Sequence, residues 1–392
     1  MHAEPSHAPA AAVDGWASAD LQACVELMRG GSKTFFAASR LLPPRVRAPA
    51  IALYAFCRVA DDLVDEAAAQ GRDGAQGVAE LMQRLDRIYA GTPVDCVEDH
   101  ALSLVVQQHE LPRPLLNALV DGFAWDAAQR RYETLEQVHD YAARVAGSVG
   151  AMMCWIMGPR ERSTLARACE LGVAMQLTNI ARDVGEDAAN GRLYLPRQWM
   201  REAGVDVPSW QAHPQASPAI QTVVARLLDE ADRLYRRAHA GIAELPADCR
   251  AAICAASLIY AEIGHQLRRQ GLDSVTRRTV VGTRRKLVLL ASAWTQAGWI
   301  YAQPNPPAAL AAVEFLLQGC AGDALAPEAA GAQGARGAQG ASLQRGLSTA
   351  TGFPNRAMPQ RIEWVINLFE RRESARLEWH DKRRSATARP AG

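Results

Sequence analysis

Apolar side chains recur along this chain at the three- and four-residue spacing of an α-helix. Alternating Val, Ile and Thr segments bounded by turns are nearly absent, and no strand–helix–strand rhythm is present. Proline and glycine clusters interrupt the periodic segments, which is typical of helices joined by loops. The pattern therefore predicts an all-α protein. The predicted breaks are Pro43-Pro44, 91–93, 111–114, Gly158-Pro159, 208–218 and Leu245-Pro246.

The chain is predicted to hold one helical domain, residues 19–320, whose helices between about Leu21 and Ile300 pack as one bundle with polar pocket residues directed inward. Residues 1–18 are rich in Ala, Pro and His and lack the apolar run of a secretory signal, which favours a disordered leader. Residues 321–357 are rich in Ala and Gly, which predicts a flexible linker. Residues 358–392 are predicted to form an amphipathic helix and a basic tail.

Composition narrows the function classes. The chain has 392 residues, 49% of them hydrophobic, so it can bury a large core. Its net charge of +1 lacks the basic excess of a nucleic-acid binder. Eight cysteines without CxxC pairs indicate reduced thiols and a cytoplasmic location. Since no apolar run reaches the roughly 18 residues that span a bilayer, any membrane contact is expected to be peripheral. The helix in 358–392 is expected to dock on the bundle or on a partner, with peripheral contact to a membrane surface as the alternative.

A polar stripe follows one predicted helix in the first part of the chain. At about 100° per residue, Tyr54, Arg58, Asp61 and Asp65 fall within roughly 60° of one another, with Asp62 beside them. The rest of this helix is apolar, so the stripe is expected to line an internal cavity. The alternative is a solvated charged face.

A second helix repeats the arrangement downstream. Gln176, Asn179, Asp183 and Asp187 share one face, and Arg182 lies next to them. In each stripe two aspartates are four residues apart, which places both carboxylates on one side of a helix. Facing pairs of carboxylates repel unless cations lie between them. Magnesium, which prefers oxygen ligands and shares its coordination sphere with phosphates, fits this pattern, so the sequence predicts diphosphate chemistry.

Further residues are candidates for substrate contact. Ser32, Lys33 and Thr34 follow two glycines and could meet a phosphate near a helix start, although a simple helix cap explains them equally well. Tyr141 precedes a stretch of small residues, 145–150, that admits either a ligand or a neighbouring helix. The remaining candidates are Tyr260, Arg277 and Arg278, with a solvated helix end as the alternative for the arginines.

Four ordered motifs closely resemble the phytoene synthase branch of the squalene/phytoene synthase family, over about Leu21 to Ile300. The resemblance implies an isoprenoid-synthase helical bundle with a central cavity, which joins two geranylgeranyl diphosphates head to head to give phytoene. It implies no role for the leader, the linker or the last helix. The motifs are residues 32–36 (SKTFF), 53–62 (LYAFCRVADD), 176–187 (QLTNIARDVGED) and 191–196 (GRLYLP).

The same resemblance implies roles for the individual residues. Magnesium, with manganese as a substitute, would be held by Asp61, Asp65, Asn179, Asp183 and Asp187, with Asp62 assisting. Diphosphate would be contacted by Ser32, Thr34, Tyr54, Arg58, Gln176, Arg182 and Tyr260, and by either Arg277 or Arg278. Tyr54, Tyr141 or Tyr260 would stabilise carbocations or relay a proton.

Three alternatives remain at the level of sequence. Squalene synthase would use farnesyl diphosphate and NADPH, and dehydrosqualene synthase would use farnesyl diphosphate without a reductant. A catalytically silent relative that acts as a binding subunit is a third. We expect no NADPH requirement and no nucleic-acid partner, because no nicotinamide or basic signature is present. We also expect the product to pass to a phytoene desaturase.

Overall fold

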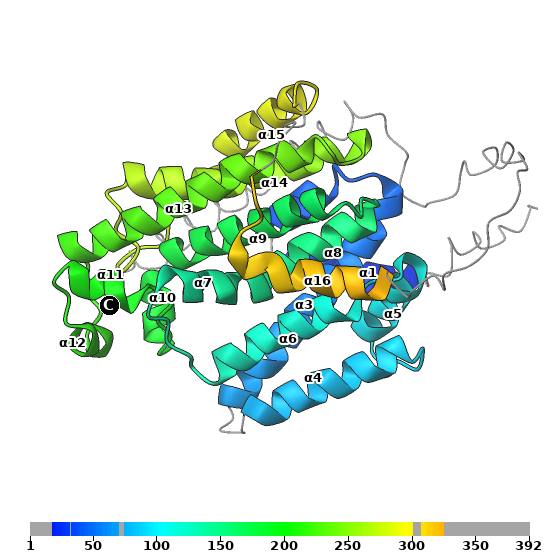
Figure 1. Ribbon diagram of the computed structural model, residues 1–392, viewed down its shortest axis with the longest axis horizontal. Helices are drawn as coiled ribbons and strands as arrows, with labels where there is room; N and C mark the ends of the chain where they lie inside the picture. The colour runs from blue at the N-terminus through cyan, green and yellow to red at the C-terminus, as the bar shows by residue number, and fades with distance from the viewer. Residues whose placement is uncertain (1–17, 32, 70–73, 301–306, 325–392) are drawn as a thin grey trace, which may run out of the picture.

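The computed structural model describes residues 18–31, 33–69, 74–300 and 307–324 (Figure 1). Every element in these ranges is helical, which confirms the predicted all-α class. The α-helices are α1 (Ser18–Gly31), α2 (Lys33–Ser39), α3 (Pro44–Ala69), α4 (Gly74–Tyr89), α5 (Val97–His109), α6 (Arg113–Ala127), α7 (Leu135–Ala142), α8 (Ser148–Met157), α9 (Arg162–Arg182), α10 (Val184–Ala189), α11 (Arg197–Glu202), α12 (Val207–Ala212), α13 (Pro218–Ile242), α14 (Ala247–Arg269), α15 (Thr283–Ala297) and α16 (Glu314–Ala324).

Local sequence explains the helix boundaries. Pro44 begins α3 and Gly158 ends α8 with φ of 121°, so the predicted breaks at Pro43-Pro44 and Gly158-Pro159 are confirmed. α13 starts with Ser217 as its N-cap, whose hydroxyl accepts the backbone N–H of Ile220. Two short helices of other kinds are present, a π-helix at Ala143–Gly147 and a 3-10 turn at Ala311–Val313.

Helix α9 runs through the middle of the bundle (Figure 1). It packs against α8, α13, α14 and the π-helix. α9 approaches α8 closely, because Gly150 and Gly172 lack a Cβ at the contact: a Cβ at Gly172 would overlap the carbonyl oxygen of Ala146, and one at Gly150 that of Ala168. The small-residue stretch predicted at 145–150 thus admits a neighbouring helix.

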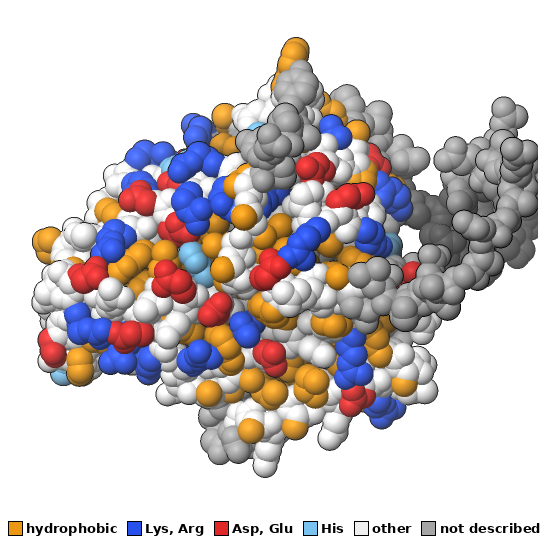
Figure 2. Space-filling view, in the orientation of Figure 1, with side chains coloured by type: hydrophobic (Ala, Val, Ile, Leu, Met, Phe, Trp, Pro, Cys, Tyr) orange, Lys and Arg blue, Asp and Glu red, His pale blue; other side chains and the backbone are white. Residues whose placement is uncertain are grey.

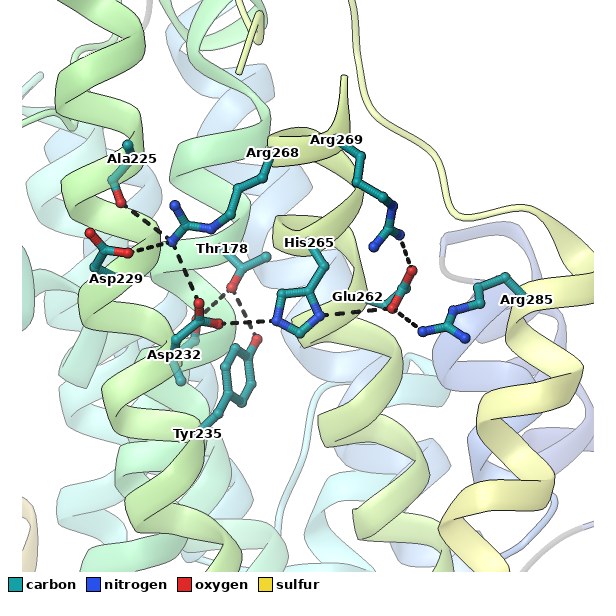
Figure 3. Close-up of polar contacts among 11 residues, drawn as sticks. Thr178, Ala225, Asp229, Asp232, Tyr235, Glu262, His265, Arg268, Arg269 and Arg285 are labelled. Atoms are coloured by element: carbon teal, nitrogen blue, oxygen red, sulfur yellow. Dashed lines mark hydrogen bonds and ion pairs between the residues drawn. The ribbon is translucent and has the colours of Figure 1, made fainter. Parts of the chain in front are cut away.

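Polar contacts join α13, α14 and α15 on one side of the bundle (Figure 3). Glu262 of α14 is 2% exposed and pairs with Arg269 and, at 2.8 Å, with Arg285 of α15. His265 lies between Glu262 and Asp232 of α13, at 3.8 and 3.6 Å from their carboxylate oxygens. Since a buried carboxylate is stable only when paired, these contacts fix α15 against α14.

The end of the described chain packs back on the bundle. Val313, Leu316 and Leu317 are buried, and Arg162 of α9 pairs with Glu314 of α16. None of the eight cysteines, all of which lie in the described ranges, forms a disulfide, and six of them are buried. Within the described ranges, no helix combines the length and the apolar character needed to cross a bilayer. The predicted leader, linker and C-terminal helix lie outside the described residues, with two exceptions. Ser18 begins α1, and residues 321–324, which were predicted to start the linker, belong to α16.

Candidate active site

A cavity of about 340 Å³ lies among α2, α3, α8, α9, α13 and α14. Its wall is largely apolar, and a small set of polar groups interrupts it. The apolar lining includes Phe35, Leu53, Val149, Met153, Leu171, Met175 and Ile253, and the polar lining includes Tyr54, Gln176, Asn179 and Tyr260. Such a cavity fits a long hydrocarbon chain with a polar end.

Part of each predicted polar stripe lines this cavity. Tyr54 of α3 lines it from one side, and Gln176 and Asn179 of α9 line it from the other. Tyr260 of α14 completes the polar set. Residues that are far apart in sequence therefore share one cavity, whereas Arg58, Asp61, Asp183 and Asp187 are not among the residues that line it.

Phe35 of α2 lies between the two cavity tyrosines. Its ring centroid is 6.0 Å from that of Tyr54 and 5.4 Å from that of Tyr260. Burial raises the pKa of the Tyr54 phenol, and burial raises that of Tyr260 to about 12. Both phenols are therefore neutral at physiological pH. The sequence predicted the tyrosines but gave Phe35 no role of its own.

Asn179 carries a buried acceptor that no described group satisfies. Its Nδ2 donates to Gln176 Oε1 at 3.3 Å, whereas its Oδ1 has no hydrogen-bond partner. An unsatisfied buried oxygen is costly, and a cation would satisfy it. Asn179 is thus suited to the predicted role of metal ligand.

The first acidic cluster lies at the partly exposed rim. Arg58 pairs with Asp61 at 3.8 Å and also with Asp62, and all three side chains are between 43 and 46% exposed. Asp65 lies in α3, but the structure does not describe its side chain. We expected a buried stripe here; the carboxylates that are described are instead open to solvent.

The second acidic cluster differs from the predicted continuous helix. α9 ends at Arg182, and Asp183 is a non-helical junction with φ of −105° before α10 begins at Val184. The helical hydrogen bonds nevertheless continue, since Asp183 N–H donates to Asn179 O at 2.9 Å and Asp187 N–H to Asp183 O at 2.8 Å. The predicted alignment of Asn179, Asp183 and Asp187 is therefore kept across a break.

Two arginines hold Asp183. Arg182 Nε donates to Asp183 Oδ1 at 2.7 Å, and Arg278 Nε lies 3.0 Å from the same oxygen. Arg278 also approaches Glu186 at 3.4 Å. Arg277 instead donates to the carbonyl of Gln270. Of the two predicted arginines, Arg278 is the one that reaches the acidic cluster.

Asp187 is held in an environment that disfavours its charge. Burial, followed by repulsion from Asp183, raises the pKa of this carboxyl to about 7, against the opposing effect of Arg192. A cation between Asp183 and Asp187 would reverse this shift. The electrostatics at Asp187 thus agree with the predicted metal role.

The comparison with known proteins decides the family. Residues 28–286 match the squalene/phytoene synthase family. A phytoene synthase of Cereibacter sphaeroides is 54% identical over 287 residues, which cover 72% of this chain and 81% of that protein. A 15-cis-phytoene synthase of Pantoea ananas is 36% identical over 294 residues, which cover 73% and 95%. The chain belongs to the squalene/phytoene synthase family.

Solved structures of the squalene/phytoene synthase family share the fold. A dehydrosqualene synthase in complex with ligand has a TM-score of 0.66 and 31% identity, and the match covers 72% of this chain and 97% of that one. A squalene synthase of Alicyclobacillus acidocaldarius has a TM-score of 0.59 and 26% identity, over 64% and 94%. The chain is therefore an isoprenoid-synthase bundle and a prenyltransferase that carries out head-to-head condensation in carotenoid biosynthesis, as the sequence predicted.

Tyr141, a predicted substrate contact, is not among the residues that line the cavity of this family member. Its hydroxyl donates to Asp126 Oδ2 at 2.7 Å, and that of Tyr194 donates to Asp126 Oδ1 at 2.6 Å. The two rings stack with centroids 4.9 Å apart. A role of Tyr141 toward substrate remains a prediction.

Asp126 is a residue that sequence reasoning missed. It ends α6, accepts hydrogen bonds from both tyrosines and adds to the charge repulsion felt by Asp187. No second acid follows it at helical spacing, so the DxxxD pattern could not reveal it. Its placement links the aromatic cluster to the second acidic cluster.

Three predicted contacts cannot be placed. Ser32 lies outside the described residues, and Lys33 and Thr34 begin α2 without described side chains.

One compact group of three potential metal ligands occurs elsewhere in the described part of the chain, at Cys96, Glu98 and Asp99. Arg84 already binds both of its carboxylates, so this trio is a structural ion pair.

Proposed function

We propose that this enzyme joins two molecules of geranylgeranyl diphosphate head to head and releases phytoene by way of a cyclopropyl diphosphate. The observation that carries the proposal is the apolar cavity whose polar residues, Tyr54, Gln176, Asn179 and Tyr260, come from both acidic motifs and from α14. The identity to relatives that are named phytoene synthases supports this product.

The proposal includes magnesium, with manganese as a substitute, at the two acidic clusters. Asp61, Asp65, Asn179, Asp183 and Asp187 would hold the ions, with Asp62 assisting. The unsatisfied Oδ1 of Asn179 and the raised pKa of Asp187 support the fit. The ions would supply positive charge that stabilises the departing diphosphate.

Arginines at the rim would orient the diphosphate. Arg58, Arg182 and Arg278 now donate to carboxylates of the two clusters. Phosphate oxygens accept the same guanidinium N–H groups with similar geometry. We infer that these arginines stabilise the charge that develops when the first substrate ionises to an allylic cation.

The cavity wall would protect the cations. The aromatic rings of Phe35, Tyr54 and Tyr260 offer ring faces to positive charge, and the apolar lining excludes water. Because both tyrosines are neutral at physiological pH, neither is the base that takes the final proton. We assign that proton to the released diphosphate, which the arginines hold nearby.

The setting of the enzyme belongs to the same proposal. We place it in the cytoplasm, with peripheral membrane contact through the predicted helix in 358–392 and transfer of phytoene to a desaturase. Those residues lie outside the described ranges, so this part is supported by composition alone.

Product analysis tests the proposal. The purified protein with magnesium would be incubated with geranylgeranyl or farnesyl diphosphate, each with and without NADPH, and the lipid extract analysed by mass spectrometry. We expect phytoene from the longer substrate and no effect of NADPH. A preference for farnesyl diphosphate in kcat/KM would instead indicate a dehydrosqualene synthase, and a reduced product that needs NADPH would indicate a squalene synthase. Binding without turnover would indicate a silent relative.

A further inference from the structure

The segment from residue 274 to residue 300 is strongly basic. It contains Arg277, Arg278, Arg284, Arg285 and Lys286, and no Asp or Glu occurs between Asp273 and Glu314. The whole chain has 43 basic and 42 acidic residues. On the face drawn in Figure 2, side chains of the two signs are interspersed. Residues 274–300 thus carry five basic side chains and no acidic one, and among the five Arg278 pairs with Asp183 and Arg285 with Glu262.

The same segment holds most of the exposed large apolar side chains in the described part of the chain. Val280 is 57% exposed, Val288 56% and Trp299 75%; the fourth is Phe315 of α16. Exposed apolar side chains are common singly, but three that share a basic segment are unusual.

Of these side chains, Val288 lies on the outward face of α15, whereas Val280 precedes the helix and Trp299 follows it. Leu289, Leu290 and Ala293 are buried, and Arg285 is held by Glu262 of α14 (Figure 3). The opposite face then carries Arg284, Val288 and the small residues Ala291 and Thr295, which are exposed. Arg284 forms no ion pair with any described residue. Trp299, which is 75% exposed, follows two residues after the end of α15 at Ala297.

This surface is continuous with the rim of the active site. Residues 274 and 275 pack against Gly185 next to the second acidic cluster, and Arg278 holds Asp183. Val280 follows two residues later. Helix α14, on which α15 packs, lines the cavity with Ile253, Ala256 and Tyr260.

We propose that the surface formed by residues 277–299 docks on an anionic lipid bilayer. Val280, Val288 and Trp299 would enter the interface, and Arg277, Arg284 and Lys286 would lie at the level of the lipid phosphates. Tryptophan and arginine both favour this depth. The positive charge of this surface is attracted to anionic lipid headgroups, whereas a bilayer of neutral lipids would not attract it.

A bilayer is favoured over an acidic protein partner by what the cavity holds. The apolar cavity fits a hydrocarbon chain, and such chains reside in bilayers, so a bilayer docked beside α14, which lines the cavity, would shorten their path. This step rests on the proposed function. The docking surface is distinct from the predicted helix in 358–392, and both can contribute in the full chain.

Flotation with lipid vesicles tests the proposal on the full-length protein. We expect binding to phosphatidylglycerol–phosphatidylcholine vesicles that weakens with added salt, and little binding to phosphatidylcholine alone. Arg284→Gln should weaken the affinity for these vesicles roughly fivefold, which is the contribution of one basic side chain near an anionic bilayer surface. Val288→Asp should weaken it more, because it adds a negative charge and removes an inserted side chain.

Matched substitutions on α4, which is drawn at the opposite side of the molecule from α15 in Figure 1, serve as controls. Arg87→Gln and Gln83→Asp change the charge by the same amounts at exposed helical positions and should leave binding unchanged. If the α15 variants bind vesicles as the parent does, or if the α4 controls weaken binding equally, the proposal is wrong.

A second readout separates this inference from the proposed function. With detergent-dispersed substrate, Arg284→Gln and Val288→Asp should keep the parent's turnover, because neither residue lines the cavity. Turnover depends on the active site alone in that assay. A parent that binds vesicles but makes no phytoene would support docking and contradict the proposed function.

Discussion

Arg278 Nε lies 3.0 Å from a carboxylate oxygen of Asp183, although 95 residues separate the two in sequence. The contact depends on a backbone hydrogen bond from Gly185 N–H to Ser274 O at 2.9 Å, which holds the loop before α15 against the start of α10. A residue outside both acidic motifs thus becomes part of the second cluster. Neighbouring Arg277 is directed to the carbonyl of Gln270.

Arg278→Lys should therefore impair catalysis, and Arg277→Lys should not. Lysine keeps the charge but cannot place two N–H groups on Asp183 or on a phosphate. We expect a loss of at least about tenfold in kcat/KM for Arg278→Lys, equivalent to roughly 1.4 kcal/mol. Steady-state kinetics with saturating magnesium measures it, and equal values for the two lysine variants would contradict the assignment.

Gly185→Ala tests how the loop is held. A Cβ at Gly185 would overlap the carbonyl oxygen of Val275, which is backbone and cannot rotate away. We expect a loss of about 1–3 kcal/mol in the free energy of unfolding together with reduced kcat/KM, because Arg278 moves with the loop. Denaturant unfolding provides the measurement. Gly282→Ala is the matched control, since nothing lies within 4 Å of a Cβ there.

The fold was largely predictable because its signals are local. Proline marked the start of α3 and glycine the end of α8, and helical periodicity placed Tyr54, Gln176 and Asn179 on faces that line one cavity. Each stripe needed only the geometry of its own helix. The contributions of α3 and of α9 to the cavity could thus be predicted separately from the sequence.

Other features depend on contacts between distant segments. The helix break at Asp183 is accompanied by the loop at Ser274, which no periodicity in residues 176–187 can show. Asp126 joins the site through Tyr141 and Tyr194, and Phe35 through two tyrosines on other helices. Such partners become visible only once the helices are packed.

The metal hypothesis predicts the behaviour of the carboxylates. Asp61→Asn and Asp183→Asn should each lower kcat by about a hundredfold or more, because a neutral amide binds a divalent cation poorly. The circular dichroism spectrum should be unchanged, since both residues lie at the rim of the site. Turnover close to that of the parent in both variants at saturating magnesium would refute the metal role.

Asp126→Asn should disturb the fold more than an ordinary surface change. The carboxylate accepts hydrogen bonds from the buried hydroxyls of Tyr141 and Tyr194, and an amide can accept only one of them through oxygen. We expect a destabilisation of roughly 1–3 kcal/mol in denaturant unfolding. The double variant Asp126→Asn with Tyr194→Phe should recover part of it, because the unpaired hydroxyl is removed. No recovery would show that the carboxylate's charge, and not its hydrogen bonding, is what matters.

The raised pKa of Asp187 predicts how the stability of the metal-free protein depends on pH. The folded protein holds this proton with a pKa of about 7, whereas an unfolded chain releases it near pH 4. The folded state therefore binds more protons between these values, so its stability should fall as pH rises from about 4 to 7 and then level off.

Thermal unfolding of the metal-free protein in EDTA at pH 5, 6, 7 and 8 would measure this dependence of stability on pH. Asp187→Asn should flatten the slope and raise the Tm at pH 8, and Asp95→Asn, which removes an exposed carboxylate, should do neither. Magnesium should raise the Tm of the parent more at pH 8 than at pH 5, because a cation competes with the proton for the same oxygens. A parent and an Asp187→Asn variant with the same slope in EDTA would show that Asp187 is already ionised in the metal-free fold.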